Sequence, residues 1–412
     1  MNNSTDKKEA NRLDLSKFAG LPDKLIAGGA LVAILGIVIP SWHKTFAYSY
    51  LTAYMFMLSL MLGSLFLVLI HHLFDAYWLV PIRRFLEHIS CAVPVMAVLF
   101  IPIALFAGSI YPWMSSSGHD HSLEIKSFMY NPVSFYVMAA ALFGIWYWLS
   151  NSLRSASLEQ DKSGSAACTF TMRRYACGGI FIFAFTLTLA CFYWMKSLEH
   201  QWFSTMYGVY YFAGSVWVTL ATTYVIAFIL NGTGHLAPVM QKSTFKDIGT
   251  LFFAFTVFYA YIHFSQYFLI WNAAIPEETF WYVKREEGVW WSVGMLIVFG
   301  HFFVPFLSLL RIDAKLCLPV MVPMAAWAWL MHYADMSFNV KPVYNPTGEG
   351  ISFASLVLSL GSMALMAGAL SKWFLKEFKA HPAFPQRDPR IAETLGVYVE
   401  PLSASDTKGQ SK

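Results

Sequence analysis

Residues 262–279 read IHFSQYFLIWNAAIPEET and lie at the end of an apolar run that begins near residue 248. The run of about 24 residues is long enough to cross a bilayer as an α-helix. Polar side chains inside such a helix are costly unless they face a partner or a wet cavity, so His263, Ser265 and Gln266 indicate an internal polar site. Ordinary interhelical hydrogen bonding by the same groups is the alternative interpretation.

The composition places this chain in a membrane. Hydrophobic residues account for 57% of the 412 residues and charged residues for 13%, whereas a typical soluble domain has about 25% charged residues. The net charge of +4 comes from basic residues scattered among loops, which does not indicate a nucleic-acid partner. The five cysteines show no C-x-x-C spacing, so we expect no cysteine-bound haem or iron–sulfur cluster in this chain and assign no metal ligands.

The hydropathy pattern predicts an all-α polytopic membrane protein. Ten apolar segments are long enough to be candidate transmembrane helices, and they lie at residues 25–39, 47–70, 89–110, 132–150, 175–195, 202–230, 248–271, 289–310, 316–334 and 351–371. If all ten cross, the loops opposite the termini contain six of the 28 basic residues, namely Lys44, Lys126, Lys196, Lys284, Arg285 and Lys341. The other 22 lie on the side of the termini, so the positive-inside rule predicts that both termini are cytoplasmic.

Short similarities between two parts of the chain favour two four-helix bundles. The pair Phe143-Gly144 in the fourth span recurs as Phe299-Gly300 in the eighth. We therefore expect spans two to five and six to nine to form the bundles, with one outer helix at each end. The expected parts are a cytoplasmic tail at 1–24, the first helix and first bundle at 25–195, the second bundle at 196–336, an outer loop and last helix at 337–371, and a cytoplasmic tail at 372–412. The connection at 151–174 and the last tail are expected to be mobile or to lie on the membrane surface.

Titratable and hydrogen-bonding residues occur at several depths in the predicted spans, as a proton path requires. The candidates for a proton relay are His71, His72, Asp75, Glu87, His88, His263, Gln266, His301, His332 and Asp335. His332 and Asp335 are three residues apart and share a helix face, so we expect the carboxylate to orient the imidazole. His301 falls near mid-membrane, where no water is in reach of its side chain. For the candidates at the inner ends of spans, snorkelling or capping is the alternative.

The same parts of the chain could serve other functions, namely the binding of haem, transport or the binding of quinone. His263 and His332 could hold a b-type haem between two helices, although their aromatic neighbours would crowd the macrocycle; these are Phe264, Tyr267, Trp329 and Tyr333. Prolines in spans three, eight and nine could interrupt these helices, so a transporter built on interrupted helices is a further alternative. The outer half of spans two to five offers Tyr48, Tyr50 and Tyr54 but no titratable pair. We therefore assign no quinone-binding residues and do not expect this chain to oxidise quinol itself.

Three motifs carry a resemblance to a known family. Residues 197–210 read SLEHQWFSTMYGVY, residues 264–267 read FSQY, and residues 275–279 read IPEET. With these motifs the chain resembles the ActF-type membrane subunits (quinone-binding subunit 2) of bacterial alternative complex III, within the NrfD/polysulfide-reductase-type membrane family. The resemblance implies a multi-pass subunit of the bacterial inner membrane, in a respiratory quinol:cytochrome c oxidoreductase, with a proton-conducting or structural role.

The resemblance also implies partners. It implies a multihaem c subunit and an iron–sulfur subunit that hold c-type haems and iron–sulfur clusters, a second NrfD-like membrane subunit in which quinol binds, the quinol pool, and a terminal oxidase as a further candidate. A scaffold without a proton role, or a lipid-facing anchor that binds quinone or b-haem, is the alternative function.

One residue departs from the family pattern. Members commonly have an acidic residue before the tryptophan that ends span five, where this chain has Tyr193, whereas Asp335 occupies the corresponding place in the second bundle. This departure puts the first bundle's half of a proton path in doubt. Lys196 and Glu199 lie nearby and are expected either to compensate or to pair with each other at the surface.

Overall fold

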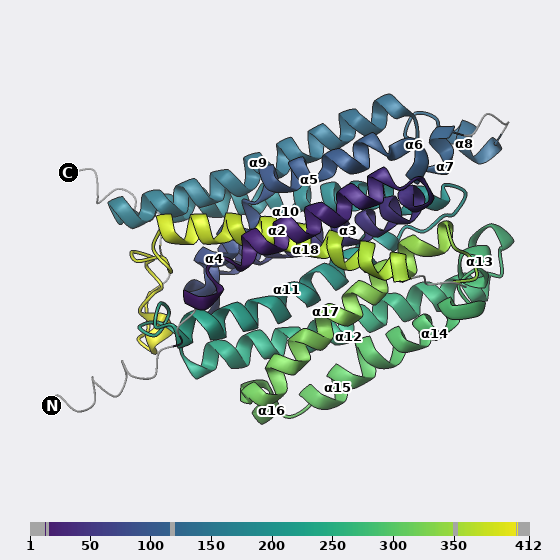
Figure 1. The fold of residues 1–412 in the computed structure, drawn as a ribbon. Helices are drawn as coiled ribbons and strands as arrows, with labels where there is room; N and C mark the ends of the chain where they lie inside the picture. Colours follow the sequence, from purple (N-terminus) through teal and green to yellow (C-terminus); the bar gives the residue numbers. More distant parts are fainter. Residues whose placement is uncertain (1–12, 14–15, 116–119, 349–352, 401, 403–412) are drawn as a thin grey trace.

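The protein is a bundle of long helices (Figure 1). The computed structural model describes residues 13, 16–115, 120–348, 353–400 and 402. It is 82% helical, and no strand occurs in these residues. Nine helical segments of the described chain are long and apolar enough to cross a membrane. The prediction of an all-α polytopic membrane protein is therefore confirmed.

The ninth predicted span is present as α17 (Leu318–Val340), which is outside those nine segments. Its 23 residues measure about 35 Å along the axis, enough for the apolar core of a bilayer. Its apolar character is diluted because the helix contains His332, Asp335 and Asn339. α17 packs against α3 (His43–Phe74), α11 (Tyr207–Gly232) and α14 (Gly288–Ile297), so it takes the place of a tenth spanning helix inside the bundle.

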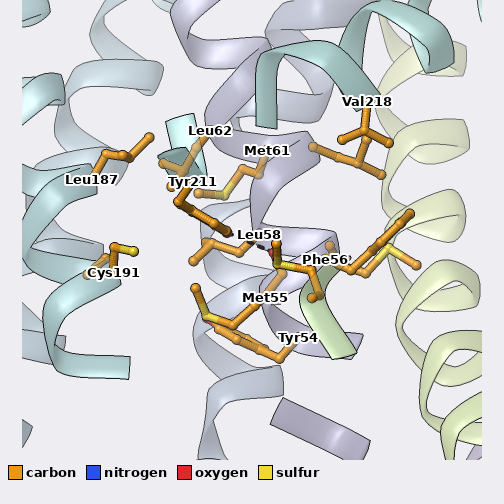
Figure 2. Close-up of a cluster of buried hydrophobic side chains, with 14 of the residues drawn as sticks. Tyr54, Met55, Phe56, Leu58, Met61, Leu62, Leu187, Cys191, Tyr211 and Val218 are labelled. Atoms are coloured by element: carbon orange, nitrogen blue, oxygen red, sulfur yellow. Dashed lines mark hydrogen bonds between the residues drawn. The ribbon is translucent and has the colours of Figure 1, made fainter. Parts of the chain in front are cut away.

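α3 is the central helix of the molecule. It contacts helices of both halves of the chain, and nearly all of its side chains from Phe46 to His72 are buried. Figure 2 shows its core, where Met55 and Leu62 belong to the same buried cluster as Leu187 of α10 (Ala166–Trp194) and Tyr211 of α11. Gly63 allows α11 to come close, because a Cβ atom there would lie 2.7 Å from the backbone oxygen of Ser215. A helix that is apolar on all sides is stable here because protein surrounds it.

The other helices form two rings that meet at α3. In the first ring, α3, α5, α9 and α10 contact one another in turn, with α4 packed on α3 and α9. In the second, α11 contacts α12 and α17, and the segment from α14 to α15 closes the ring between them. α2 and α18 lie side by side outside the rings (Figure 1). The bounds are α2 Leu21–Val38, α4 Val80–Ser90, α5 Val93–Leu105, α9 Pro132–Ser163, α12 Lys242–Ala273, α15 Val304–Leu309 and α18 Phe353–Ala380.

The helix that carries His301 is interrupted. α14 passes into a π-helical segment, Val298–Phe303, and continues as α15. Pro305 has no N–H with which to bond the carbonyl of His301, four residues earlier, and this local loss of pairing favours a wider turn. Single π-helical turns of this kind occur often at functional sites.

Two segments expected to be mobile or to lie on the membrane surface are part of the helical bundle or packed against it. α9 continues to Ser163 and α10 begins at Ala166, so the supposed connection at 151–174 is helical except for Gly164 and Ser165. The described part of the last tail also packs against the bundle, where Asp388 pairs with Arg83 at 2.5 Å. Several charges of these segments form ion pairs: Asp161 with Arg84, Arg173 with Asp75, and Arg154 with Glu377. We call this end of the bundle, where α2 begins and α18 ends, the basic end.

Candidate functional site

His301 is held between two aromatic rings in the middle of the second bundle. The imidazole lies parallel to Trp217 of α11, with ring centroids 3.8 Å apart, and to Tyr259 of α12 at 3.7 Å. The Trp217 ring is fixed because its Nε1 donates a hydrogen bond to Thr256 Oγ1 at 2.8 Å. His301 is fully buried, and neither of its ring nitrogens has a hydrogen-bond partner among the described residues. Its nitrogens are therefore open to a proton or a water molecule.

His332 and Asp335 of α17 reach the same place. One nitrogen of each histidine and one carboxylate oxygen of Asp335 lie within 4.8 Å of one another. The expected hydrogen bond between Asp335 and His332 is absent from the described structure: Nδ1 of His332 and Oδ2 of Asp335 have no partner there. His332 is oriented instead by Ser59 of α3, whose Oγ lies 2.9 Å from Nε2. His301, His332 and Asp335 together form the buried cluster of the site.

Tyrosine and asparagine side chains surround Asp335. The Tyr210 hydroxyl donates a hydrogen bond to Asp335 Oδ1 and lies 3.2 Å from the Tyr259 hydroxyl. Asn339 Nδ2 lies 3.0 Å from the Tyr210 hydroxyl and 2.8 Å from the Asp335 carbonyl oxygen. No lysine or arginine of the described chain pairs with Asp335, whose carboxylate accepts its hydrogen bonds from the Tyr210 hydroxyl and the Asn339 amide.

The hydrogen bonds continue toward the end opposite the basic end. The Tyr207 hydroxyl donates to Asn339 Oδ1 at 2.9 Å, and Arg285 donates to the Asn339 carbonyl oxygen at 3.2 Å. Arg285 also pairs with Glu199 at 2.9 Å. The expectation that Glu199 pairs with Lys196 is wrong: the second partner of Glu199 is Lys284, at 3.2 Å.

His263 lines a cavity beside this network. The cavity has a volume of about 760 Å³ and lies between α12 and α14, and Tyr259, His263, Tyr282, Arg285 and Glu286 are among its polar lining groups. The ring of His263 lies 5.5 Å from Tyr210 and is parallel to Tyr259. Tyr259 thus fills the space between His263 and the His301 cluster. A haem held between His263 and His332 does not fit this packing.

Gln266 forms hydrogen bonds between segments and is not a member of the His301 cluster. Its Oε1 accepts a hydrogen bond from Ser204 at 3.0 Å, and its Nε2 donates to the Tyr282 hydroxyl at 3.0 Å. The residue joins α12 to the loop before α11 and to α13 (Pro276–Val283). Gln266 therefore makes the interhelical hydrogen bonds that were the alternative interpretation of the sequence.

The remaining candidates gather at the basic end of the first bundle, away from His301. His71 Nε2 accepts a hydrogen bond from Arg83 at 2.8 Å, and Glu87 also pairs with Arg83, at 3.1 Å. Asp75 accepts a hydrogen bond from Arg173 Nε at 3.0 Å. The ring of His72 lies 4.7 Å from that of His71. These contacts are those of a buried ion-pair network that fixes helix ends.

Several residues of the site were not candidates from the sequence, namely Ser59, Tyr207, Tyr210, Tyr259 and Asn339. Two signals were present. Tyr207 and Tyr210 end the 197–210 motif that carries the family resemblance, and Asn339 follows Asp335 by one helical turn. Ser59 and Tyr259 come from other helices, and only the fold brings them to the site.

No family model matches the chain, and no curated protein matches it.

Proposed function

We propose that this chain is an integral membrane subunit of a respiratory quinol:cytochrome c oxidoreductase of the alternative complex III type, and that its second bundle provides the outer half of a proton path. The family resemblance supports the choice of complex, with c-type haems and iron–sulfur clusters in partner subunits. The observation that supports the proton role is the buried group of His301, His332 and Asp335, which lie close together and each carry an atom without a hydrogen-bond partner among the described residues.

The geometry allows a proton to leave this group toward the cavity. Asp335 Oδ1 accepts a hydrogen bond from the Tyr210 hydroxyl, which lies 3.2 Å from the Tyr259 hydroxyl. Tyr259 and His263 both line the cavity. Because hydroxyl groups both donate and accept, they can pass a proton along such a chain. Asn339 holds the Tyr210 hydroxyl in place. The outward direction assumes that the basic end faces the cytoplasm, as the positive-inside rule predicts.

Replacing Asp335 with Asn tests the proton role. The complex that contains this chain is purified, inserted into liposomes, and assayed for protons released per quinol oxidised. We expect Asp335→Asn and Tyr210→Phe to lower proton release while the subunits still assemble and oxidise quinol. Two matched controls are Asp313→Asn, at an exposed ion pair with Arg311, and Tyr224→Phe, whose hydroxyl donates to the Lys315 carbonyl oxygen. Wild-type proton release in both test variants would support a scaffold instead.

Quinone binding at the cavity is the second candidate, and a specific observation favours it. The cavity is lined mainly by apolar side chains, has a volume typical of small-molecule sites, and presents the His263 imidazole. Tyr48, Tyr50 and Tyr54 in the first bundle are not free for this role, because each donates its hydroxyl to a backbone carbonyl. Labelling by a photoreactive quinone analogue tests it: His263→Gln should abolish labelling between α12 and α14, and His121→Gln, outside the cavity, should not.

A further inference from the structure

His88 on α4 is a buried histidine that the proton path does not use. Its side chain is fully buried, and neither Nδ1 nor Nε2 has a hydrogen-bond partner among the described residues. A buried imidazole with both nitrogens unpaired is costly unless a ligand meets one of them. The group therefore indicates that something occupies the space that it faces.

Two further metal-binding side chains face the same space. Glu377 lies in the last turn of α18, and His381 directly follows the last residue of that helix. Their side chains are close together, with His381 Nδ1 3.7 Å from Glu377 Oε2. Ligand atoms of His88, Glu377 and His381 all lie within 4.8 Å of one another. The rings of the two histidines are 5.6 Å apart. Three ligands, from α4, from α18 and from the residue directly after α18, thus lie close to one point.

We propose that His88, Glu377 and His381 bind a Zn²⁺ ion at the basic end. Two imidazoles and one carboxylate are a common Zn²⁺ ligand set, with water in the fourth position. Tetrahedral bonds of about 2.0–2.1 Å place neighbouring ligand atoms about 3.3 Å apart. The ligand atoms of the three residues are at most 4.8 Å apart. Side-chain movements of about 1 Å bring them to the spacing that Zn²⁺ requires, with no change in the helices.

The surrounding contacts orient the ligands as in known zinc sites. His381 Nδ1 lies 3.0 Å from the Glu377 carbonyl oxygen, so an N–H there donates to it and leaves Nε2 free for the metal. Arg154 donates a hydrogen bond to Glu377 Oε2, which leaves Oε1 free. Trp373 Nε1 donates to the His88 carbonyl oxygen at 3.1 Å and keeps α18 against α4. His381 is partly exposed and provides an entry route from solvent.

The metal would fasten the chain that follows α18. Beyond His381, the backbone N–H of Gln386 donates to Asp161 Oδ1 at 2.9 Å, and Asp388 pairs with Arg83. A Zn²⁺ ion between α4 and the end of α18 fixes the point from which this segment starts. The site is separate from the His301 cluster, so this proposal does not depend on the proton path.

Metal content of the full chain tests the proposal. The protein is stripped with a chelator, incubated with ZnCl₂, passed through a desalting column, and analysed for zinc by mass spectrometry. We expect about one Zn²⁺ ion per chain in the wild type, and near-background zinc in His88→Gln and His381→Gln. His235→Gln is the matched control, because His235 is exposed and packs on Phe378 beside the site without belonging to the cluster.

Co²⁺ substitution provides a second measurement. Tetrahedral Co²⁺ at two imidazoles and a carboxylate should give strong visible absorption in the wild type and in His235→Gln, and none in His381→Gln. His381→Gln is the decisive variant, because a partly exposed residue can be changed without loss of the fold. The proposal is overturned if the wild type retains no Zn²⁺, or if His381→Gln retains as much as the wild type.

Discussion

The Ser59 hydroxyl of α3 lies 2.9 Å from Nε2 of His332 on α17 and links the two bundles. Ser59 has one hydroxyl proton, which it donates to the Phe56 carbonyl oxygen at 2.6 Å. Its remaining contact with His332 must therefore be an accepted one, so Nε2 carries the proton of the neutral imidazole. Nδ1 is then the basic nitrogen, and it has no hydrogen-bond partner among the described residues.

Loss of the Ser59 hydroxyl should destabilise the protein. Ser59→Ala leaves the buried Nε2–H of His332 without an acceptor, and we expect a loss of about 1–3 kcal/mol. The midpoint of thermal unfolding in detergent measures this change. Ser64→Ala is the matched control, since Ser64 is buried on the same helix and its hydroxyl has no partner among the described residues. Equal destabilisation by both changes would contradict the role given to Ser59.

Packing of α2 on α18 should depend on one of two neighbouring glycines. A Cβ atom at Gly29 would lie 2.6 Å from the Gly361 backbone oxygen, so Gly29→Ala must push the helices apart. We expect a loss of about 1–3 kcal/mol, as for other overpacked sites. Gly28→Ala should be neutral or slightly stabilising, because no atom lies within 4 Å of the added Cβ. Thermal unfolding compares the two, and a similar loss in Gly28→Ala would refute this packing.

Docking of the segment after α18 should depend on Asp388. Burial alone would raise the pKa of Asp388, but the Arg83 guanidinium outweighs it and holds this pKa below its ordinary value. The pair therefore contributes stability at neutral pH and loses it only as pH falls below the ordinary range of a carboxyl group. We expect Asp388→Asn to increase amide hydrogen exchange in residues 383–397 by about 10-fold or more, because a buried cation loses one partner. Asp313→Asn, in an exposed pair, should leave exchange there unchanged.

The helices could be predicted from sequence because long apolar runs have few other solutions in a membrane. The helical continuation at 151–163 was missed because its charged and small residues are also typical of a loop. The central place of α3 was missed for another reason. A helix that is apolar on all sides faces lipid or protein equally well, so hydropathy does not distinguish the two environments.

The candidate site was predicted in part. Depth along the spans pointed to His301, His332 and Asp335, and the structure brings these three together. The partners that set their proton positions, Ser59 and Tyr210, are ordinary residues of other helices. Their role depends on which helices are neighbours, and a single sequence does not contain that information.

Lys196 lies among aromatic rings just beyond α10. Its Nζ is 4.6 Å from the centroid of the Phe192 ring and 6.0 Å from that of Phe203, and Lys126 lies 3.7 Å over the same Phe203 ring. Burial, followed by repulsion from Lys126, lowers the pKa of Lys196 to about 8. The unfolded chain, in which the pKa has its ordinary value of about 10.4, thus binds more protons between pH 8 and 10.

Stability should therefore increase with pH in that window, because folding no longer requires a buried ammonium group. The slope contributed by Lys196 is at most about 1.4 kcal/mol per pH unit, measured as unfolding free energy or as the unfolding midpoint from pH 7.5 to 10. Lys196→Met should raise stability at pH 7.5 and remove most of the slope, and Lys126, whose pKa burial also lowers, accounts for the remainder. Lys379→Met, at an exposed position, should leave the slope as it is. A wild-type curve that is flat or falls above pH 8 would show that the Lys196 ammonium is well solvated.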